Sequence, residues 1–322
     1  MIIKLLLASI MALCLSCSNH HSMIDDLEEQ VAEKNDTIPN STRDMDGNGS
    51  TKKVLPDKTP TDSLKILAIG NSFTDDGMTY LPGLIAHAGL SYVKIAKIVV
   101  GGASLQYHYN HALQYDNVYN YYTSEGGRSF SKKGKKSFSD ALSDDQWDIV
   151  VMQQVSQYSG LYYTYQPYLD SLIVFVRRQL PHSVIAWQMT WAYGSESTHS
   201  GFSNYNQNQT TMYNAICTSV DEAVKESNLD VVIPSGMAIQ KLRATSVNNP
   251  PLDLTRDGYH LDYGAGRYVA GCTWFESLIA PVYYTCVIGN TLRTKYGRVP
   301  VDNDVATICQ QAAHEAVEEF PY

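Results

Sequence analysis

Two short polar motifs, far apart in the sequence, could together carry out nucleophilic catalysis. Ser72 lies in Gly70-Asn71-Ser72, directly after the apolar run 66–69, and Asp257 and His260 form an Asp-x-x-His motif in the last quarter of the chain. A serine nucleophile needs a base that takes its proton and a carboxylate that orients this base. Since one segment supplies both partners, the site needs a single long-range contact, from this segment to Ser72.

Each motif taken alone has a simpler structural explanation. A serine after a strand is a common helix N-cap. Asp257 and Gly258 could form a turn, with His260 capping the helix that follows. The two motifs in one chain, a serine turn after the first strand and Asp-x-x-His before the last predicted helix, favour catalysis.

The elements that must position these motifs follow a regular alternation of strand and helix. Such alternation predicts a parallel sheet with helices on both faces, and ligands bind at the carboxyl ends of its strands. Short apolar runs indicate about five strands, at 66–69, 92–100, 147–152, 184–189 and 229–234. Helical spacing predicts helices at 80–88, 108–122, 165–180, 211–227, 236–244 and 264–279, with polar loops at 124–139 and 195–210.

The N-terminal part of the chain has the features of an exported protein. Residues 1–16 combine an early lysine with an apolar run too short for a spanning helix, which is typical of an export signal. Cys17 follows a small residue, so we expect lipidation there (residues 1–17 being the signal and lipobox), with ordinary secretion as the alternative. Residues 18–62 are polar and predict a disordered tether, which leaves 63–322 as the catalytic domain.

Composition excludes several classes of partner and cofactor. The net charge of −9 over 322 residues argues against a nucleic-acid partner. The four cysteines beyond the leader form no CxxC motif and no Cys/His cluster in the sequence, so their spacing predicts no zinc site. They are Cys217, Cys272, Cys286 and Cys309, and spacing alone does not pair them. We expect Cys217 and Cys272 to be buried free thiols.

The ordered motifs resemble those of the SGNH/GDSL hydrolase superfamily. Its members carry a serine turn after the first strand, a glycine after the second, an Asn or Gln after the third, and Asp-x-x-His near the C-terminus. This chain matches that order over about 64–288, with Gly70-Asn71-Ser72, Gly101-Gly102, Gln153-Gln154 and Asp257-Gly258-Tyr259-His260. It looks most similar to an uncharacterised bacterial lipoprotein branch with GNSF and DGYH motifs. It departs from the common pattern in having GNSFT rather than GDSL, and glutamines in place of the Asn of the third block.

The resemblance implies a three-layer α/β/α sandwich of flavodoxin-like type and a role for each matching residue. Ser72 would be the nucleophile, His260 the general base and Asp257 its orienting carboxylate. The oxyanion hole would comprise the N–H groups of Ser72 and Gly102 (or Gly101) and the amide of Gln153, with Gln154 as second choice. This chemistry needs neither a metal nor an organic cofactor.

For the substrate, we expect O-acetyl groups on a carbohydrate at the cell envelope. Trp191 and Tyr193 follow the fourth strand, where they could stack on a sugar ring from the rim of the site or pack in the interior. Asp75 and Asp76 are expected to favour the helix N-terminus rather than to act in catalysis. One alternative is a lipase or esterase on small or lipid esters, with an apolar acyl cleft beside Ser72. The other is a non-catalytic carbohydrate-binding lipoprotein that retains the fold.

Overall fold

A computed structural model describes residues 55–59 and 61–321 of the chain. The predicted signal, the predicted lipidation site at Cys17 and most of the predicted tether lie outside the described residues. Within the described part, no helix has the length and apolar character needed to cross a membrane.

The centre of the structure is a sheet of seven strands with the order β4-β3-β2-β1-β5-β6-β7 among the described residues. Five of these are parallel and match the five predicted strands. They are β1 (Leu64–Gly70), β2 (Val93–Val99), β5 (Ile149–Met152), β6 (Val184–Gln188) and β7 (Val231–Ile233). The apolar runs form strands because both faces of the sheet are covered, so that nearly every side chain of β1 is buried.

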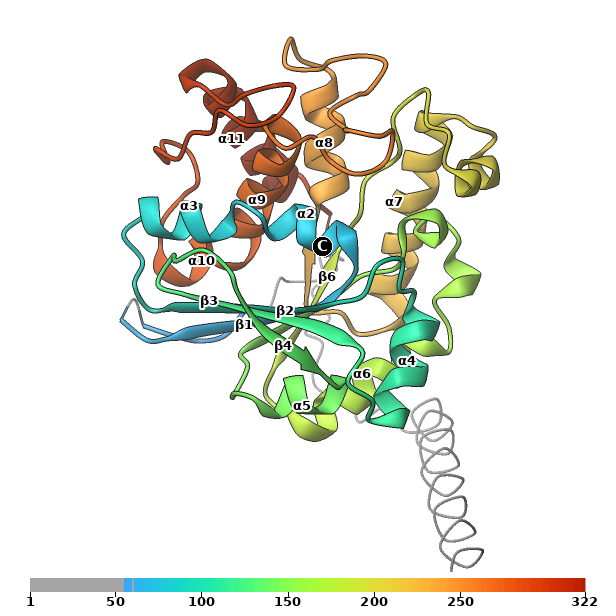
Figure 1. Cartoon of the computed structure of the whole chain (residues 1–322), viewed down its shortest axis with the longest axis vertical. Coiled ribbons are helices and arrows are strands. Elements are labelled where there is room, and N and C mark those ends of the chain that lie inside the picture. The colour runs from blue at the N-terminus through green and yellow to red at the C-terminus, as the bar shows by residue number, and fades with distance from the viewer. Residues whose placement is uncertain (1–54, 60, 322) are drawn as a thin grey trace, which may run out of the picture.

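Helices cover both faces, so the structure is the predicted three-layer α/β/α sandwich. Figure 1 shows α2, α3 and α9 on one side of the sheet and α5 and α6 on the other. The helices are α2 (Ser72–Met78), α3 (Leu81–His87), α4 (Leu105–Gln114), α5 (Phe138–Ser143), α6 (Tyr168–Gln179), α7 (Gln209–Glu226), α8 (Ser235–Arg243), α9 (Ala265–Leu278), α10 (Ala280–Tyr283) and α11 (Asn303–Glu318). Three short 3₁₀ turns are η1 (Ser156–Tyr158), η2 (Tyr162–Thr164) and η3 (Ser200–Tyr205).

The segment 115–139 differs from its prediction as helix and loop. Helix α4 ends at Gln114, and Tyr115 takes a left-handed conformation with φ 55° that stops it. The chain then forms an antiparallel hairpin of β3 (Tyr119–Glu125) and β4 (Ser131–Lys136) on the outer side of β2. The tyrosine-rich run forms a strand because Tyr119 and Tyr121 alternate into the core. The lysines of exposed β4 discourage another chain from pairing with this edge.

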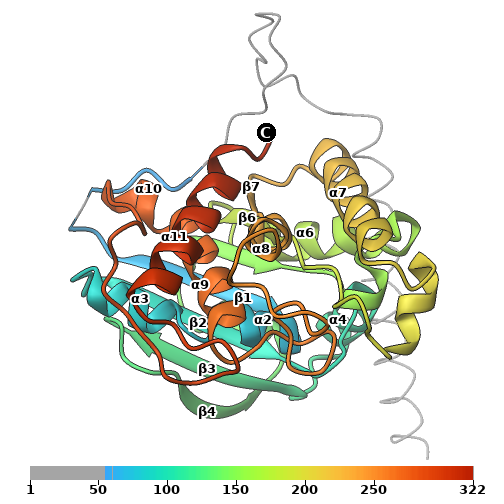
Figure 2. The same ribbon diagram turned by 90° about the horizontal axis from the view of Figure 1, so that it is seen from above.

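Helix α9 is not the last helix, as the sequence had suggested, but the central one of its layer. Almost every residue of Ala265–Leu278 is buried, as expected for a helix enclosed on all sides. It packs against α2, α3, α8 and α11, and Figure 2 shows α11 beside it. The loop that carries His260 therefore leads directly into a rigid helix that contacts the helix of Ser72.

The strand order places the site where the topology reverses. The chain passes from β1 to β2 on one side and later returns to β5 on the other side of β1. In open α/β sheets the crevice at the carboxyl ends of such strands is the usual ligand site. Ser72 lies two residues beyond the end of β1.

Candidate active site

Ser72 is the first residue of α2, and its turn is held by Asn71. The Asn71 side chain accepts a hydrogen bond from the Phe73 N–H (2.9 Å) and donates one to the Ala103 carbonyl (2.9 Å). Gly70 is required by close packing, because a Cβ there would lie 2.1 Å from the Thr74 Oγ1 atom. The serine is thereby fixed to the end of β1 and tied to the turn that follows β2.

The segment 255–261 forms a tight loop whose own hydrogen bonds orient the histidine. Asp257 Oδ1 accepts the backbone N–H groups of His260 (2.8 Å) and Tyr259 (3.2 Å), while Asp257 Oδ2 lies 2.7 Å from His260 Nδ1. Gly258 has φ +91°, a backbone conformation that residues with a side chain rarely adopt. The Asp-x-x-His spacing is therefore suited to a carboxylate that fixes both the backbone and the ring of the histidine.

The structure brings Ser72, His260 and Asp257 into one hydrogen-bonded chain. His260 Nε2 lies 2.9 Å from Ser72 Oγ, although the two residues are 188 positions apart. With the Nδ1 proton donated to Asp257, Nε2 is left as an acceptor for the serine proton. Burial opposes ionisation of Asp257, but hydrogen bonds from the His260 side chain and backbone outweigh it and hold its pKa below the usual range. The carboxylate is therefore ionised at neutral pH, as a base-orienting group must be.

A buried carboxylate that the sequence analysis assigned to the helix terminus locks the two halves of the site together. Asp76, 1% exposed in its side chain, accepts hydrogen bonds from Arg267 Nε (2.8 Å), from Arg256 Nη1 (3.1 Å) and from the backbone N–H of Leu261 (2.8 Å). Arg256 and Leu261 flank the Asp257–His260 segment. Asp76 thus connects the serine helix to the histidine loop, which is a positioning role. Its neighbour Asp75 instead pairs with buried Lys97 (2.8 Å).

The turn after β2 offers backbone donors to the cavity beside Ser72. Gly102 has φ +71°, and the N–H groups of Gly101 and Gly102 have no acceptor among the described residues. Both glycines line the cavity, together with Ser72. The N–H of Ser72, at the first helical position, also has no partner within α2. These groups can bind an oxyanion without giving up existing hydrogen bonds.

The two glutamines after β5 do not line this cavity. Gln153 is buried behind Asn71, where its Nε2 donates to Asn71 Oδ1 (2.9 Å) and its Oε1 accepts from Thr74 Oγ1 (2.7 Å). Gln154 is equally buried, and its Oε1 accepts the backbone N–H groups of Leu105 and Val155. The geometry makes Gln153 a support for the serine turn, which differs from the expected oxyanion donor.

Of the two alternatives for Trp191 and Tyr193, the structure supports packing in the interior and not sugar stacking at the rim, since both side chains are fully buried. Trp191 stacks on Phe73 with ring centroids 4.3 Å apart and donates to the Tyr259 carbonyl (2.8 Å). Tyr193 hydrogen-bonds Ser156 Oγ (2.8 Å). Both residues pack in the interior against the surroundings of the loop 255–261, because β6, the strand that precedes them, ends inside the molecule.

We name the space beside Ser72 the catalytic cavity; its volume is about 340 Å³. Sequence reasoning missed the walls formed by Val155, Ser156, Gln157 and His199, because these residues lie in or beside short 3₁₀ turns without recognisable spacing. The ring centroids of His199 and Tyr259 lie 4.7 Å apart. Burial is the main cause that lowers the pKa of His199, and repulsion from His260 is the second. The lining residues are Asn71, Ser72, Phe73, Gly101, Gly102, Val155, Ser156, Gln157, His199, Tyr259 and His260.

A second hollow, the tyrosine groove, has a volume of about 350 Å³. It shares no lining residue with the catalytic cavity, but Ser104, Gln154 and Tyr158 of the groove lie within two positions in the sequence of residues that line the cavity. Every lining side chain is a hydroxyl, an amide or a tyrosine. These residues are Ser104, Gln106, Gln154, Tyr158, Tyr163, Thr164, Gln166 and Tyr168.

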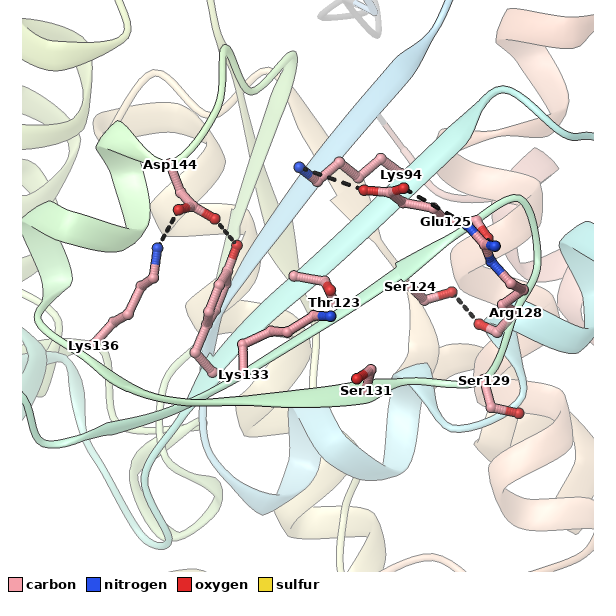
Figure 3. A pocket seen from close by; sticks show the side chains of 11 residues that line it. Lys94, Thr123, Ser124, Glu125, Arg128, Ser129, Ser131, Lys133, Lys136 and Asp144 are labelled. Atoms are coloured by element: carbon pink, nitrogen blue, oxygen red, sulfur yellow. Dashed lines mark hydrogen bonds and ion pairs between the residues drawn. The ribbon is translucent and has the colours of Figure 1, made fainter.

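A larger hollow lies on the β3–β4 hairpin but has no catalytic grouping. This hairpin groove has a volume of about 630 Å³, and Figure 3 shows most of its charged side chains paired with one another. Lys136 pairs with Asp144, while Glu125 lies 3.8 Å from both Lys94 and Arg128. Paired charges of this kind are typical of a solvated surface. The larger volume of the hairpin groove therefore does not identify it as the active site.

Comparison with known proteins places the chain in a family. The profile of the "Domain of unknown function (DUF4886)" matches residues 65–316. The chain belongs to this family. The crystal structure of a DUF4886 family protein from Bacteroides uniformis is 35% identical over 80% of this chain and 96% of that chain, with a TM-score of 0.72.

The comparison also finds structures with lower similarity to this DUF4886 chain. A candidate SGNH hydrolase from Slackia heliotrinireducens is 21% identical, over 67% of this chain and 99% of that one, with a TM-score of 0.47. Axe2, an acetylxylan esterase from Geobacillus stearothermophilus, is 13% identical, over 68% of this chain and 95% of that one, with a TM-score of 0.45. No curated protein matches the chain.

Proposed function

We propose that the protein is a serine esterase that hydrolyses carboxylic esters through an acyl-enzyme. The observation that carries this proposal is the hydrogen-bonded chain from Ser72 Oγ through His260 to Asp257, with distances of 2.9 and 2.7 Å. Ser72 and His260 line a cavity together with Gly101 and Gly102, whose backbone N–H groups have no acceptor among the described residues. A nucleophile, a base, an orienting carboxylate and oxyanion donors at one point are the set that acyl transfer requires.

The mechanism follows from these positions. His260 Nε2 takes the Ser72 proton as Oγ attacks the ester carbonyl, and the N–H groups of Ser72 and Gly102 stabilise the negative oxygen of the tetrahedral intermediate. The imidazolium, stabilised by Asp257, then protonates the departing alcohol. Water enters, His260 takes one of its protons, and hydrolysis of the acyl-enzyme releases the carboxylic acid and regenerates Ser72.

We propose an O-acetylated carbohydrate as the substrate, and the tyrosine groove supports this choice. Tyr158 and Tyr163 are 39% and 78% exposed, so their rings are available for stacking on a sugar. The groove amides are already oriented, since Gln106 donates to Tyr168 Oη (2.7 Å) and Gln166 to Ser227 Oγ (2.9 Å). A groove without aliphatic side chains suits a glycan better than the acyl chain of a lipid.

The decisive experiment compares wild type with Ser72→Ala on p-nitrophenyl acetate, butyrate and octanoate, and on acetylated xylan with released acetate as the readout. We expect activity to be highest on acetate and to fall at least about 10³-fold in the variant. Ser131→Ala, which changes an exposed serine on β4, is the matched control and should behave as wild type. A preference for octanoate would favour a lipid esterase. Equal rates for wild type and Ser72→Ala would reject esterase chemistry and leave a carbohydrate-binding protein.

Export and lipidation at Cys17 remain proposals from the sequence. They would place the enzyme at the cell envelope, where it meets extracellular glycans. Metabolic labelling with a palmitate analogue should mark the wild type and not Cys17→Ser, and labelling of neither protein would reject the anchor.

A further inference from the structure

A second group of reactive side chains lies outside the catalytic cavity. Glu276 Oε1 is 2.7 Å from His314 Nδ1 and 3.5 Å from Cys286 Sγ, and Cys286 Sγ is 3.8 Å from His314 Nδ1. Among the described residues, this is the only group of three His, Cys, Asp or Glu side chains whose ligand atoms all lie within 4.8 Å of one another. The three residues come from α9, the loop after α10, and α11.

The contacts are not those of a second catalytic triad. In a Cys-His-Glu relay the thiol and the carboxylate contact opposite ring nitrogens, so that a proton can pass through the imidazole. Here both lie against the same nitrogen, Nδ1 of His314. Three donor atoms that converge on one point are the arrangement of metal ligands.

The surrounding backbone holds two of the three side chains from behind. Glu276 Oε2 accepts the N–H of Val287 (2.8 Å), which leaves Oε1 directed at the other two residues. Cys286 Sγ accepts the N–H of Ile288 (3.4 Å). The Glu276 side chain is only 8% exposed, on a helix that is buried along nearly its whole length. Such supporting hydrogen bonds orient the ligands.

We propose that Glu276, Cys286 and His314 bind a zinc ion, with water as the fourth ligand. Sulfur, nitrogen and oxygen donors together suit Zn²⁺, and tetrahedral bonds of ~2.0–2.3 Å put ligand atoms ~3.3–3.6 Å apart. The two separations that involve Sγ are close to this range, whereas the Glu276–His314 pair must open by ~0.6 Å as the metal replaces the proton between them. Binding releases the thiol proton of Cys286 to solvent, and as Nδ1 of His314 gives up its proton Nε2 carries one, so that the metal binds a neutral imidazole.

The position of the site indicates a structural role. Glu276 lies eleven residues beyond the start of α9, about 17 Å along the helix from the end that adjoins the histidine loop. Close by, Tyr283 Oη donates to the carbonyl of Asp62 (2.8 Å), just before β1 begins. A metal here would join α9 and α11 where the chain enters the domain. The proposal is therefore independent of the esterase activity.

The test uses the full chain with cobalt as a spectroscopic probe. His20 and His21 are replaced by alanine in every sample, so that this adjacent pair near the N-terminus does not bind metal. We expect one Co²⁺ per chain with a thiolate-to-cobalt charge-transfer band, and loss of the band when Zn²⁺ is added. Zn²⁺ at 100 times its Kd should raise Tm by at least about 5 °C.

Two ligand variants and two matched controls decide the outcome. Cys286→Ser and His314→Gln should each abolish the charge-transfer band and the zinc-dependent rise in Tm, while Cys217→Ser and His182→Gln retain both. Far-UV circular dichroism checks folding, and either ligand variant suffices if the other does not fold. Absence of the band in the parent chain, or its persistence in a folded ligand variant, would overturn the proposal. Chelation should leave hydrolysis of p-nitrophenyl acetate unchanged, which separates this result from the fate of the esterase proposal.

Discussion

Asp76→Asn should damage both stability and catalysis, because Asp76 is the buried link between the serine helix and the histidine loop. Asparagine keeps the size of the side chain but removes its charge. Its amide N–H₂ is a donor, so it faces another donor at Arg256, Arg267 or the N–H of Leu261 where the carboxylate offered an acceptor. Removing one partner of a buried ion pair costs ~3–5 kcal/mol. The two guanidinium groups are 21% and 18% exposed, so water partly replaces the lost partner. Both arginines also keep their contact with the Tyr263 ring.

We therefore expect the low end of that range, a loss of ~3 kcal/mol in the free energy of unfolding. This corresponds to a fall in Tm of ~6–12 °C for a domain of this size. Because Leu261 directly follows His260, a shift of its backbone moves the imidazole from Ser72. A displacement of ~1 Å can cost ~10²-fold in rate, so kcat should fall by ~10–100-fold while KM changes little.

The assay is urea unfolding followed by fluorescence, combined with steady-state hydrolysis of p-nitrophenyl acetate. Asp221→Asn is the control, since Asp221 is an exposed aspartate on α7 and its replacement should stay within about 0.5 kcal/mol of wild type. An Asp76→Asn protein with wild-type stability and wild-type kcat would refute the assignment of Asp76 as the link.

Three further predictions test other parts of the site and core. Asp257→Asn should lower kcat by ~10³–10⁴-fold with little change in KM, because the His260 tautomer is no longer fixed; an effect below 10-fold at pH 7 would contradict the relay. Gln153→Ala should cost ~1–3 kcal/mol by leaving the Thr74 hydroxyl without its acceptor and removing one of the two donors to Asn71 Oδ1, with less than a 10-fold change in kcat. A loss of ~10²–10³-fold without destabilisation would instead restore the oxyanion role first expected for Gln153. For His108, burial, followed by repulsion from His111, lowers the pKa to about 3. Since the unfolded state takes up a proton below about pH 6.5 and the folded state does not, stability falls as pH falls, by ~2 kcal/mol between pH 7 and 5. Urea midpoints at the two pH values should show this difference in wild type and a smaller one in His108→Gln; equal differences would show that His108 is not responsible.

Local sequence determined the parallel part of the sheet and both catalytic motifs. An apolar run long enough for one strand, followed by a polar turn, is recognisable because burial on both faces leaves no room for polar residues. Ser72 could be singled out because it follows such a run, and Asp257 and His260 because their contact is local. The hairpin at 119–136 was missed although tyrosine favours strands, since lysine and glycine do not and the pairing partner, the outer edge of β2, is visible only in the fold.

Tertiary structure alone decided which residues meet across the chain. Nothing near Asp76 in the sequence points to Arg256 or Arg267, and Trp191 and Tyr193 follow a strand in the same way whether they face solvent or the core. The direction of the Gln153 amide depends on the position of Asn71, 82 residues away. Glu276, Cys286 and His314 have no ligand-like spacing and approach one another only because α11 packs on α9. Spacing reveals contacts within one turn or strand, whereas contacts between elements depend on how the whole core packs.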